Sequence, residues 1–193
     1  QAKNFIQSAI DKGAEEGIAY LLLAEVYIDL WKSSGNKTDL AEAQRVLQDY
    51  VRTGSDYNQE AQLVLAYIDL LQGSATRSEN RINKMLDLDP NMTGEHRHNL
   101  FISSNRTGWP QLLKYCEKIR DGMGKSARTT AFMAFCQFKA GQKNEAKYLI
   151  DGAIAQAPRD GLIQSLYGYM LKANGLEEHA SVAVGKALEL NSK

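Results

Sequence analysis

The sequence has few of the residues that interrupt helices or cross-link a chain. Only 3 of its 193 residues are proline and 2 are cysteine. Two cysteines are too few for a disulfide framework, and we expect Cys116 and Cys136 to be buried, reduced thiols that pack as small apolar side chains. With so few prolines, long stretches rich in Ala, Leu, Glu, Gln and Lys remain, and this composition favours an all-helical fold.

A net charge and a long apolar run are lacking as well. The 23 basic residues balance the 23 acidic ones, so no overall field attracts nucleic acid or anionic lipid. No apolar stretch approaches the roughly 20 residues that a membrane-spanning helix needs. We therefore expect no membrane span, and the sequence does not decide between a cytoplasmic and a periplasmic location.

Signatures of catalysis and of cofactor binding are also missing. His96 and His98 lie two residues apart, which points them to different faces of a helix, and no cysteine or carboxylate is placed to complete a metal site. The glycines form no phosphate-binding loop, and no nucleophile motif or catalytic triad order occurs. We therefore expect no enzyme, no metal and no cofactor.

What the sequence does contain is a period of 34 residues. Gly73 lies 68 residues before Gly141, which lies 34 before Gly175, and Pro90 lies 68 before Pro158. Each glycine follows an apolar helical pattern and is expected to end that helix with a positive φ. The period predicts four consecutive helix-turn-helix units, at 59–92, 93–126, 127–160 and 161–193.

Small residues indicate where the two helices of a unit approach closely. The first helices have a small residue at one repeated position, namely Ala66, Ala134 and Gly168. The second helices have two small residues with a branched side chain between them, namely Ala146 and Ala153 around Ile150, and Ala180 and Ala187 around Val184. A single pair cannot bury its apolar stripe, so we expect neighbouring pairs to stack.

The N-terminal third follows the same pattern with two departures. Residues 17–58 are predicted to form a unit whose inter-helix turn, "KSSGNKT", is stretched, with Asp39 as a cap of the second helix. Residues 1–16 fit the second helix of a truncated repeat. We expect either that this sequence is a fragment of a larger protein or that this helix packs as a lone cap.

The period, the helix-turn-helix unit, the small residues and the closing proline resemble the tetratricopeptide repeat (TPR) family, most clearly in 127–160 and least in 93–126. The resemblance implies an all-α, right-handed superhelix, or solenoid, whose first helices line a concave groove. The family's large aromatic residue near the start of the first helix is present at Tyr20. Other residues replace it in the later units, namely Gln62, His96, Thr130 and Gln164.

An aromatic residue recurs one position beyond the small contact residue in four first helices, at Tyr67, Phe101, Phe135 and Tyr169. On a concave face these rings would form a ladder that contacts a partner, although the same spacing also fits rings that pack against one another. Aromatic and arginine side chains are frequent anchors in recognition. The predicted groove is completed by basic and polar residues, Arg97, Asn105, Arg128, Lys139 and Lys172, and by Glu25 and Asp29 at an acidic N-terminal end.

These features predict a non-enzymatic scaffold that binds a peptide or a helix of a partner protein in its groove. The apolar residues of the terminal helices also allow a homodimer that forms through these helices. One alternative is a regulatory domain of a larger bacterial protein, such as a winged-helix transcription regulator whose DNA-contacting part lies outside this chain. A helical-repeat RNA binder is disfavoured by the neutral charge and by Glu25 and Asp29, so we expect no nucleic acid contact.

Overall fold

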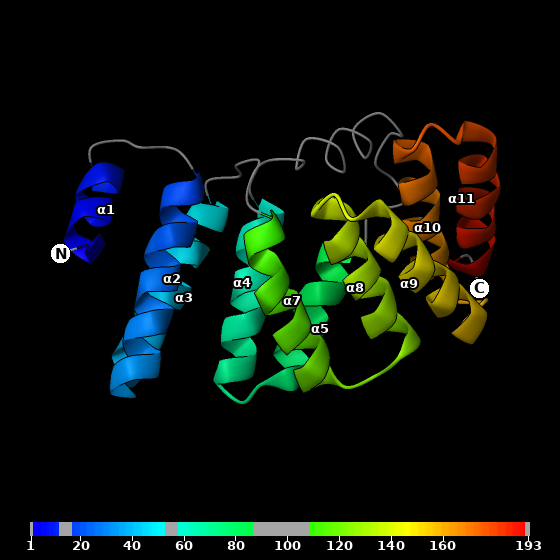
Figure 1. Ribbon diagram of the computed structural model, residues 1–193. Helices are drawn as coiled ribbons and strands as arrows, with labels where there is room; N and C mark the ends of the chain where they lie inside the picture. Colours follow the sequence, from blue (N-terminus) through cyan, green and yellow to red (C-terminus); the bar gives the residue numbers. More distant parts are fainter. Residues whose placement is uncertain (1, 12–16, 53–57, 87–108, 192–193) are drawn as a thin grey trace. The chain divides into compact units, whose positions relative to one another are not determined.

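The computed structural model describes residues 2–11, 17–52, 58–86 and 109–191, and the regular elements in these ranges are all helices (Figure 1). The predicted all-α fold is therefore confirmed. Within these ranges no helix combines the length and the apolar character that crossing a bilayer requires. In chain order the helices are α1 (Ala2–Asp11), α2 (Gly17–Ser34), α3 (Lys37–Arg52), α4 (Asn58–Leu71), α5 (Ala75–Leu86), α7 (Trp109–Met123), α8 (Ala127–Lys139), α9 (Lys143–Gln156), α10 (Gly161–Ala173) and α11 (Glu177–Asn191).

The chain divides into two compact units, residues 1–81 and 82–193, and α5 spans the boundary. In the first unit, α1 packs on α2, α2 on α3, and α3 on α4. In the second unit, α7 packs on α8, α8 on α9 and α10 on α11, and α10 also contacts α8 and α9. Each helix thus packs mainly on its neighbours in sequence, as expected for stacked repeats.

The three glycines predicted to end first helices do so with the same geometry. Gly73, Gly141 and Gly175 have φ angles of 79°, 83° and 78°, which glycine adopts without the strain that a Cβ atom would cause. At the second of these turns, the Gly141 amide donates to the Phe138 carbonyl at 3.0 Å and the Gln142 amide to the Gln137 carbonyl at 2.9 Å. This is a Schellman motif, and the same two bonds recur at the other two turns.

The predicted close approach of paired helices is tightest between α10 and α11. Ala66 and Ala134 have no exposed surface, as expected of contact residues. At Gly168 even a methyl group does not fit, because a Cβ atom there would lie 2.7 Å from Val184 Cγ2 and 3.3 Å from the Ala180 carbonyl oxygen. The backbone of α10 therefore lies directly against α11 at this point.

The stretched turn predicted within residues 17–58 is not observed. Only Gly35 and Asn36 separate α2 from α3, because the additional residues continue the first helix, which reaches 18 residues. Asn36, rather than the predicted Asp39, serves as the N-terminal cap of α3, since its Oδ1 accepts a hydrogen bond from the Thr38 amide at 3.1 Å. Both predictions were wrong for the same reason: helical structure extends into residues that resemble a polar loop.

A buried carboxylate joins α4 to α5 in the first unit. The Asp69 side chain is 2% exposed and pairs with Arg81 Nε at 2.9 Å and with Arg77 Nε at 3.6 Å. Arg81 also donates to Gln62 Oε1 at 2.8 Å. Charged hydrogen bonds of this kind compensate the cost of burying Asp69, so ion pairs fill the space beside α4.

We predict that Gly168→Ala destabilises the protein by about 1–2 kcal/mol. The new methyl group would overlap Val184, whose branched side chain has few alternative rotamers in a helix. The resulting overpacking outweighs the helix propensity of about 1 kcal/mol that alanine gains over glycine. Urea unfolding followed by circular dichroism measures the change in free energy.

Gly152→Ala is the matched control, because Gly152 lies in α9 and a Cβ atom there has no neighbour within 4 Å. Helix propensity alone predicts an unchanged or higher stability for this variant. Equal unfolding free energies for the two variants would contradict the close contact of α10 with α11.

Candidate partner-binding site

The aromatic residues predicted to line a groove lie in the core. Tyr67, Phe135 and Tyr169 are 5%, 1% and 6% exposed, while Phe101 lies outside the described residues. The ring of Phe135 packs edge-on against Trp109, with ring centroids 5.5 Å apart and planes at 88°. For these three rings the structure therefore agrees with inward packing, the second option that their spacing left open, and not with an open ladder.

Lys139, predicted to be a cation of the groove, is also buried. It is 3% exposed, and its Nζ lies 5.6 Å from the ring centroid of Trp109 and 5.8 Å from that of Phe135. Both rings are within the range of a cation–π interaction. Lys139 is thus part of the contact between α7 and α8 rather than a surface contact for a partner.

Arg128 lies on the surface but is held in an ion pair. Its Nε donates to Asp160 Oδ2 at 2.7 Å, while Asp160 Oδ1 accepts from the amides of Leu162 and Ile163 at 3.0 and 3.3 Å. Asp160 therefore caps α10 and at the same time binds the first turn of α8. The arginine connects successive repeats at their first helices.

The other predicted groove residues differ in exposure. Lys172 and Glu25 are half-buried, and Asp29 is exposed and pairs with Lys32 at 2.9 Å. Arg97 and Asn105 lie outside the described residues. Within the second unit, Phe135 and Lys139 of the predicted set lie together, and both are buried.

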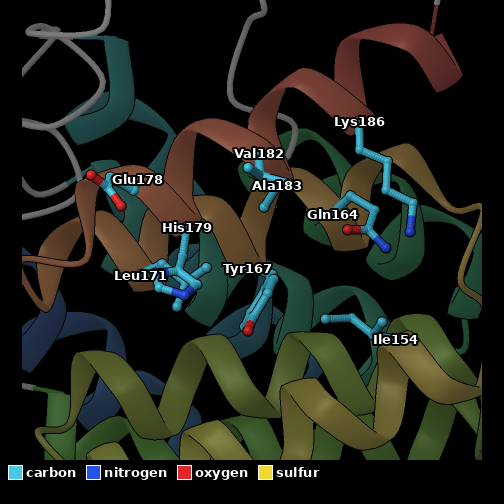
Figure 2. A pocket seen from close by; sticks show the side chains of 9 residues that line it. All are labelled: Ile154, Gln164, Tyr167, Leu171, Glu178, His179, Val182, Ala183 and Lys186. Atoms are coloured by element: carbon cyan, nitrogen blue, oxygen red, sulfur yellow. The ribbon is translucent and has the colours of Figure 1, made fainter.

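The second unit instead carries two surface grooves in the same repeat register. The first, of about 500 Å³, lies between α7, α8 and α9, and the second, of about 460 Å³, lies between α9, α10 and α11 (Figure 2). Most residues that line one groove have a counterpart 34 positions away in the other. The pairs are Arg120 and Ile154, Met133 and Tyr167, Gln137 and Leu171, Asn144 and Glu178, Glu145 and His179, Tyr148 and Val182, and Leu149 and Ala183.

In the second groove apolar side chains lie between two charged ends. Figure 2 shows Tyr167 and Ile154 at the same hollow, with Glu178 and Lys186 at its opposite ends. First helices provide the floor of each groove, and second helices provide both walls. Second helices α7, α9 and α11 therefore follow one another along this face, with one groove on each side of α9.

Each groove has a strongly exposed apolar side chain on its wall. Tyr148 on α9 is 80% exposed, and Val182 on α11 is 74% exposed. They occupy the same position of successive repeats, whereas the equivalent position on α7 is Lys114. The sequence contains this signal, an apolar residue on the polar side of two second helices 34 positions apart.

Among the charged residues that line the first groove, the acidic ones outnumber the basic one. Glu117 and Glu145 are exposed and line it, and in the described part of the chain neither has an ion-pair partner. Arg120 also lines this groove, but its guanidinium pairs with Asp121 at 2.8 Å. On the ridge formed by α9, the hydrogen bond from Lys147 to Asp151 at 2.5 Å raises the pKa of Lys147. The free charge of the groove is therefore negative.

The equivalent positions of the first unit have a different chemistry. Asp69, Arg77 and Arg81, which form the buried ion pairs beside α4, lie 68 residues before Gln137, Glu145 and Leu149 of the first groove. The counterpart of Tyr148 there is Asn80. These positions thus form ion pairs between α4 and α5 in the first unit, while in the second unit they line an open and partly apolar groove.

The two cysteines are free and buried, as predicted. Burial raises the pKa of the Cys136 thiol well above its usual value, so it stays protonated at neutral pH. Among the residues that the structure describes, no three His, Cys, Asp or Glu side chains gather in a way that could hold a metal ion.

Comparison with known proteins gives similarity only at the level of structure. No protein-family model matches the chain, and no curated protein matches it. Among solved structures, "MamA 41-end from Desulfovibrio magneticus RS-1" is 16% identical, with a TM-score of 0.40, covering 88% of this chain and 95% of that one. "YrrB: a TPR protein with an unusual peptide-binding site" is 14% identical, with a TM-score of 0.40, covering 97% and 93%.

The fold is tetratricopeptide-like. This follows from the chain's own helix pairs, which repeat their Schellman turns and small contact residues in the predicted register.

We predict that Asp160→Ala lowers the free energy of unfolding by about 1–2 kcal/mol, because it removes both the cap of α10 and the partner of Arg128. Asp151→Ala is the control, since it removes an ion pair between exposed side chains on α9 and is expected to change stability by less than about 0.5 kcal/mol. Chemical denaturation measures both. Equal effects would show that the Arg128–Asp160 pair does not connect the repeats.

We predict opposite effects for the buried ladder and the exposed groove wall. Phe135→Ala should cost about 3–5 kcal/mol, because it leaves a cavity beside Trp109. Tyr148→Ala should change stability by less than about 0.5 kcal/mol, since most of its side chain is already in water. Thermal and urea unfolding compare the two variants. A Phe135→Ala protein as stable as the parent would contradict the placement of this ring in the core.

Proposed function

We propose that this chain is a non-enzymatic scaffold that binds a segment of a partner protein, and that the two grooves of the second unit form the binding surface. The observation that carries this proposal is the recurrence of one groove in two successive repeats, each with a strongly exposed apolar side chain at the same position. Exposed apolar surface beside polar residues is typical of interaction sites.

The construction of the grooves supports binding with little loss of conformational entropy. Their floors and walls are side chains of helices α7 to α11, which the glycine turns and the Asp160 cap hold in place. A surface that is already ordered loses few degrees of freedom on association, so a small number of contacts suffices. Tyr148 is suited to be the principal anchor, because a tyrosine presents a large apolar ring and a polar hydroxyl.

The buried ladder does not provide an equivalent surface among the described residues. Tyr67, Phe135 and Tyr169 expose too little area to hold a partner without opening the helix packing. The basic residues named with them are buried in one case, Lys139, and ion-paired in another, Arg128. We therefore locate partner binding on the side of the second helices.

Selection of peptides from a random phage-displayed library on the whole chain tests this proposal. Peptides enriched on the parent protein are expected to bind the double variant Tyr148→Ser with Val182→Ser at least 10-fold more weakly. Phe5→Ser is the matched control, because Phe5 is a 79% exposed aromatic residue on α1 in the first unit, and this variant should bind as the parent does.

Failure to enrich any peptide would contradict the scaffold function. Enriched peptides that bind the double variant as tightly as the parent would show that the grooves are not the binding surface. Circular dichroism confirms that the variants keep the parent's helix content, as expected for substitutions of exposed side chains.

A further inference from the structure

We infer that the occupant of the two grooves is a basic amphipathic α-helix of a partner protein, which crosses α9 and places one apolar side chain in each groove. The inference rests on the proposed function and specifies the chemistry of the partner. It is carried by the position of the grooves on either side of α9, by the backbone that surrounds them and by the charge of their walls.

The backbone around the grooves favours a helical occupant. Helices α7 to α11 use their amide and carbonyl groups internally, and no strand edge is present among the described residues. An extended peptide would find no backbone partners here, although strand addition depends on them. Its polar groups would lose water without compensation in the apolar parts of the grooves. A helix satisfies its own backbone and binds through side chains alone.

The separation of the grooves agrees with two turns of a helix. The first helices α8 and α10, which form the floors of the two grooves, contact each other. Packed helices lie about 8–10 Å apart, so the two grooves above them have centres separated by about 10 Å. Residues seven positions apart on one helix lie on the same face and about 10.5 Å apart, from a rise of 1.5 Å per residue. The occupant therefore needs two apolar side chains at positions i and i+7, with an intermediate one above the exposed ring of Tyr148.

Charge complementarity favours basic residues beside these anchors. Three carboxylates line the grooves, Glu117 and Glu145 in the first and Glu178 in the second. Of the cations, Arg120 is already paired with Asp121, and Lys186 lies at the end of the second groove away from Glu178 (Figure 2). Lysine or arginine on the partner would therefore face carboxylates that have no ion-pair partner within the described ranges, most strongly in the first groove.

Binding of defined peptides to the whole chain, measured by fluorescence anisotropy, tests this inference. The probe is a labelled peptide of about 20 residues, long enough for partial helicity in water, with leucines at i and i+7 and lysines on the flanks. Two comparison peptides have either the leucines moved to opposite faces or every lysine replaced by glutamate. We expect the probe to bind at least 10-fold more tightly than either.

Variants of the protein separate the contribution of the exposed apolar side chains from that of the carboxylates. Tyr148→Ser with Val182→Ser should weaken binding of the probe at least 10-fold. Glu117→Gln with Glu145→Gln should weaken it several-fold and reduce its dependence on salt, because contacts between exposed charges are screened by ions. Glu79→Gln, at an exposed carboxylate of α5, is the control. It should leave the affinity for the probe and its dependence on salt unchanged.

Equal affinity for the three peptides would overturn the inference, as would tighter binding of the glutamate peptide. Library peptides that are proline-rich and extended, but still depend on Tyr148 and Val182, would also overturn it while the proposed function stands. Sedimentation velocity tests a second copy of the chain as the occupant. Self-association that the double variant abolishes would assign the grooves to that copy and overturn the inference.

Discussion

The structure depends on the contact between the two antiparallel helices of each repeat. A glycine in the left-handed conformation ends the first helix within one residue and returns the chain beside it. Small residues then let the two backbones approach, most closely where Gly168 lies against Val184 and the carbonyl of Ala180. Both features recur at multiples of 34 residues in the described pairs α4 and α5, α8 and α9, and α10 and α11, and recurring helix pairs of this kind can stack on one another.

This regular packing explains why grooves form where they do. The first helices α4 and α8 bury most of their apolar side chains, whereas the second helices α7, α9 and α11 leave open grooves beside α9 in the second unit. In the first unit the space beside α4 contains the ion pairs of Asp69 with Arg77 and Arg81. In the second unit the corresponding positions are Gln137, Glu145 and Leu149, and all three line the first groove. Side chains that form ion pairs in the first unit are thus replaced, at the same register, by side chains that line an open groove.

The features that the sequence predicted correctly are those determined by local conformation or by volume. Gly73, Gly141 and Gly175 are predictable because few other residues tolerate their φ angles. The buried small residues are predictable because any larger side chain would separate the helices. The turn after α2 was not predictable in this way, because Ser33 and Ser34 resemble loop residues but bond back to the carbonyl of Leu30 and continue the helix.

The candidate site could not be predicted from the sequence for a different reason. Periodicity shows that Phe135 and Tyr169 share an environment, but it does not show what covers them, and Phe135 is covered by Trp109 from the preceding helix. The period likewise places Tyr148 and Val182 at equivalent positions on the polar face of the second helices, but it does not show that both are exposed beside a groove. Register is a property of the chain alone, whereas exposure depends on side chains contributed by other helices.

The distribution of exposure separates stability from recognition. Residues that hold successive repeats together, such as Trp109, Lys139 and Asp160, are buried or mostly buried and contact other helices. Tyr148 and Val182 contribute little to that packing, because most of their surface is in water. The side chains on the groove walls can therefore change without unfolding the repeats. Specificity for a partner can thus be set independently of the helix contacts on which the fold depends.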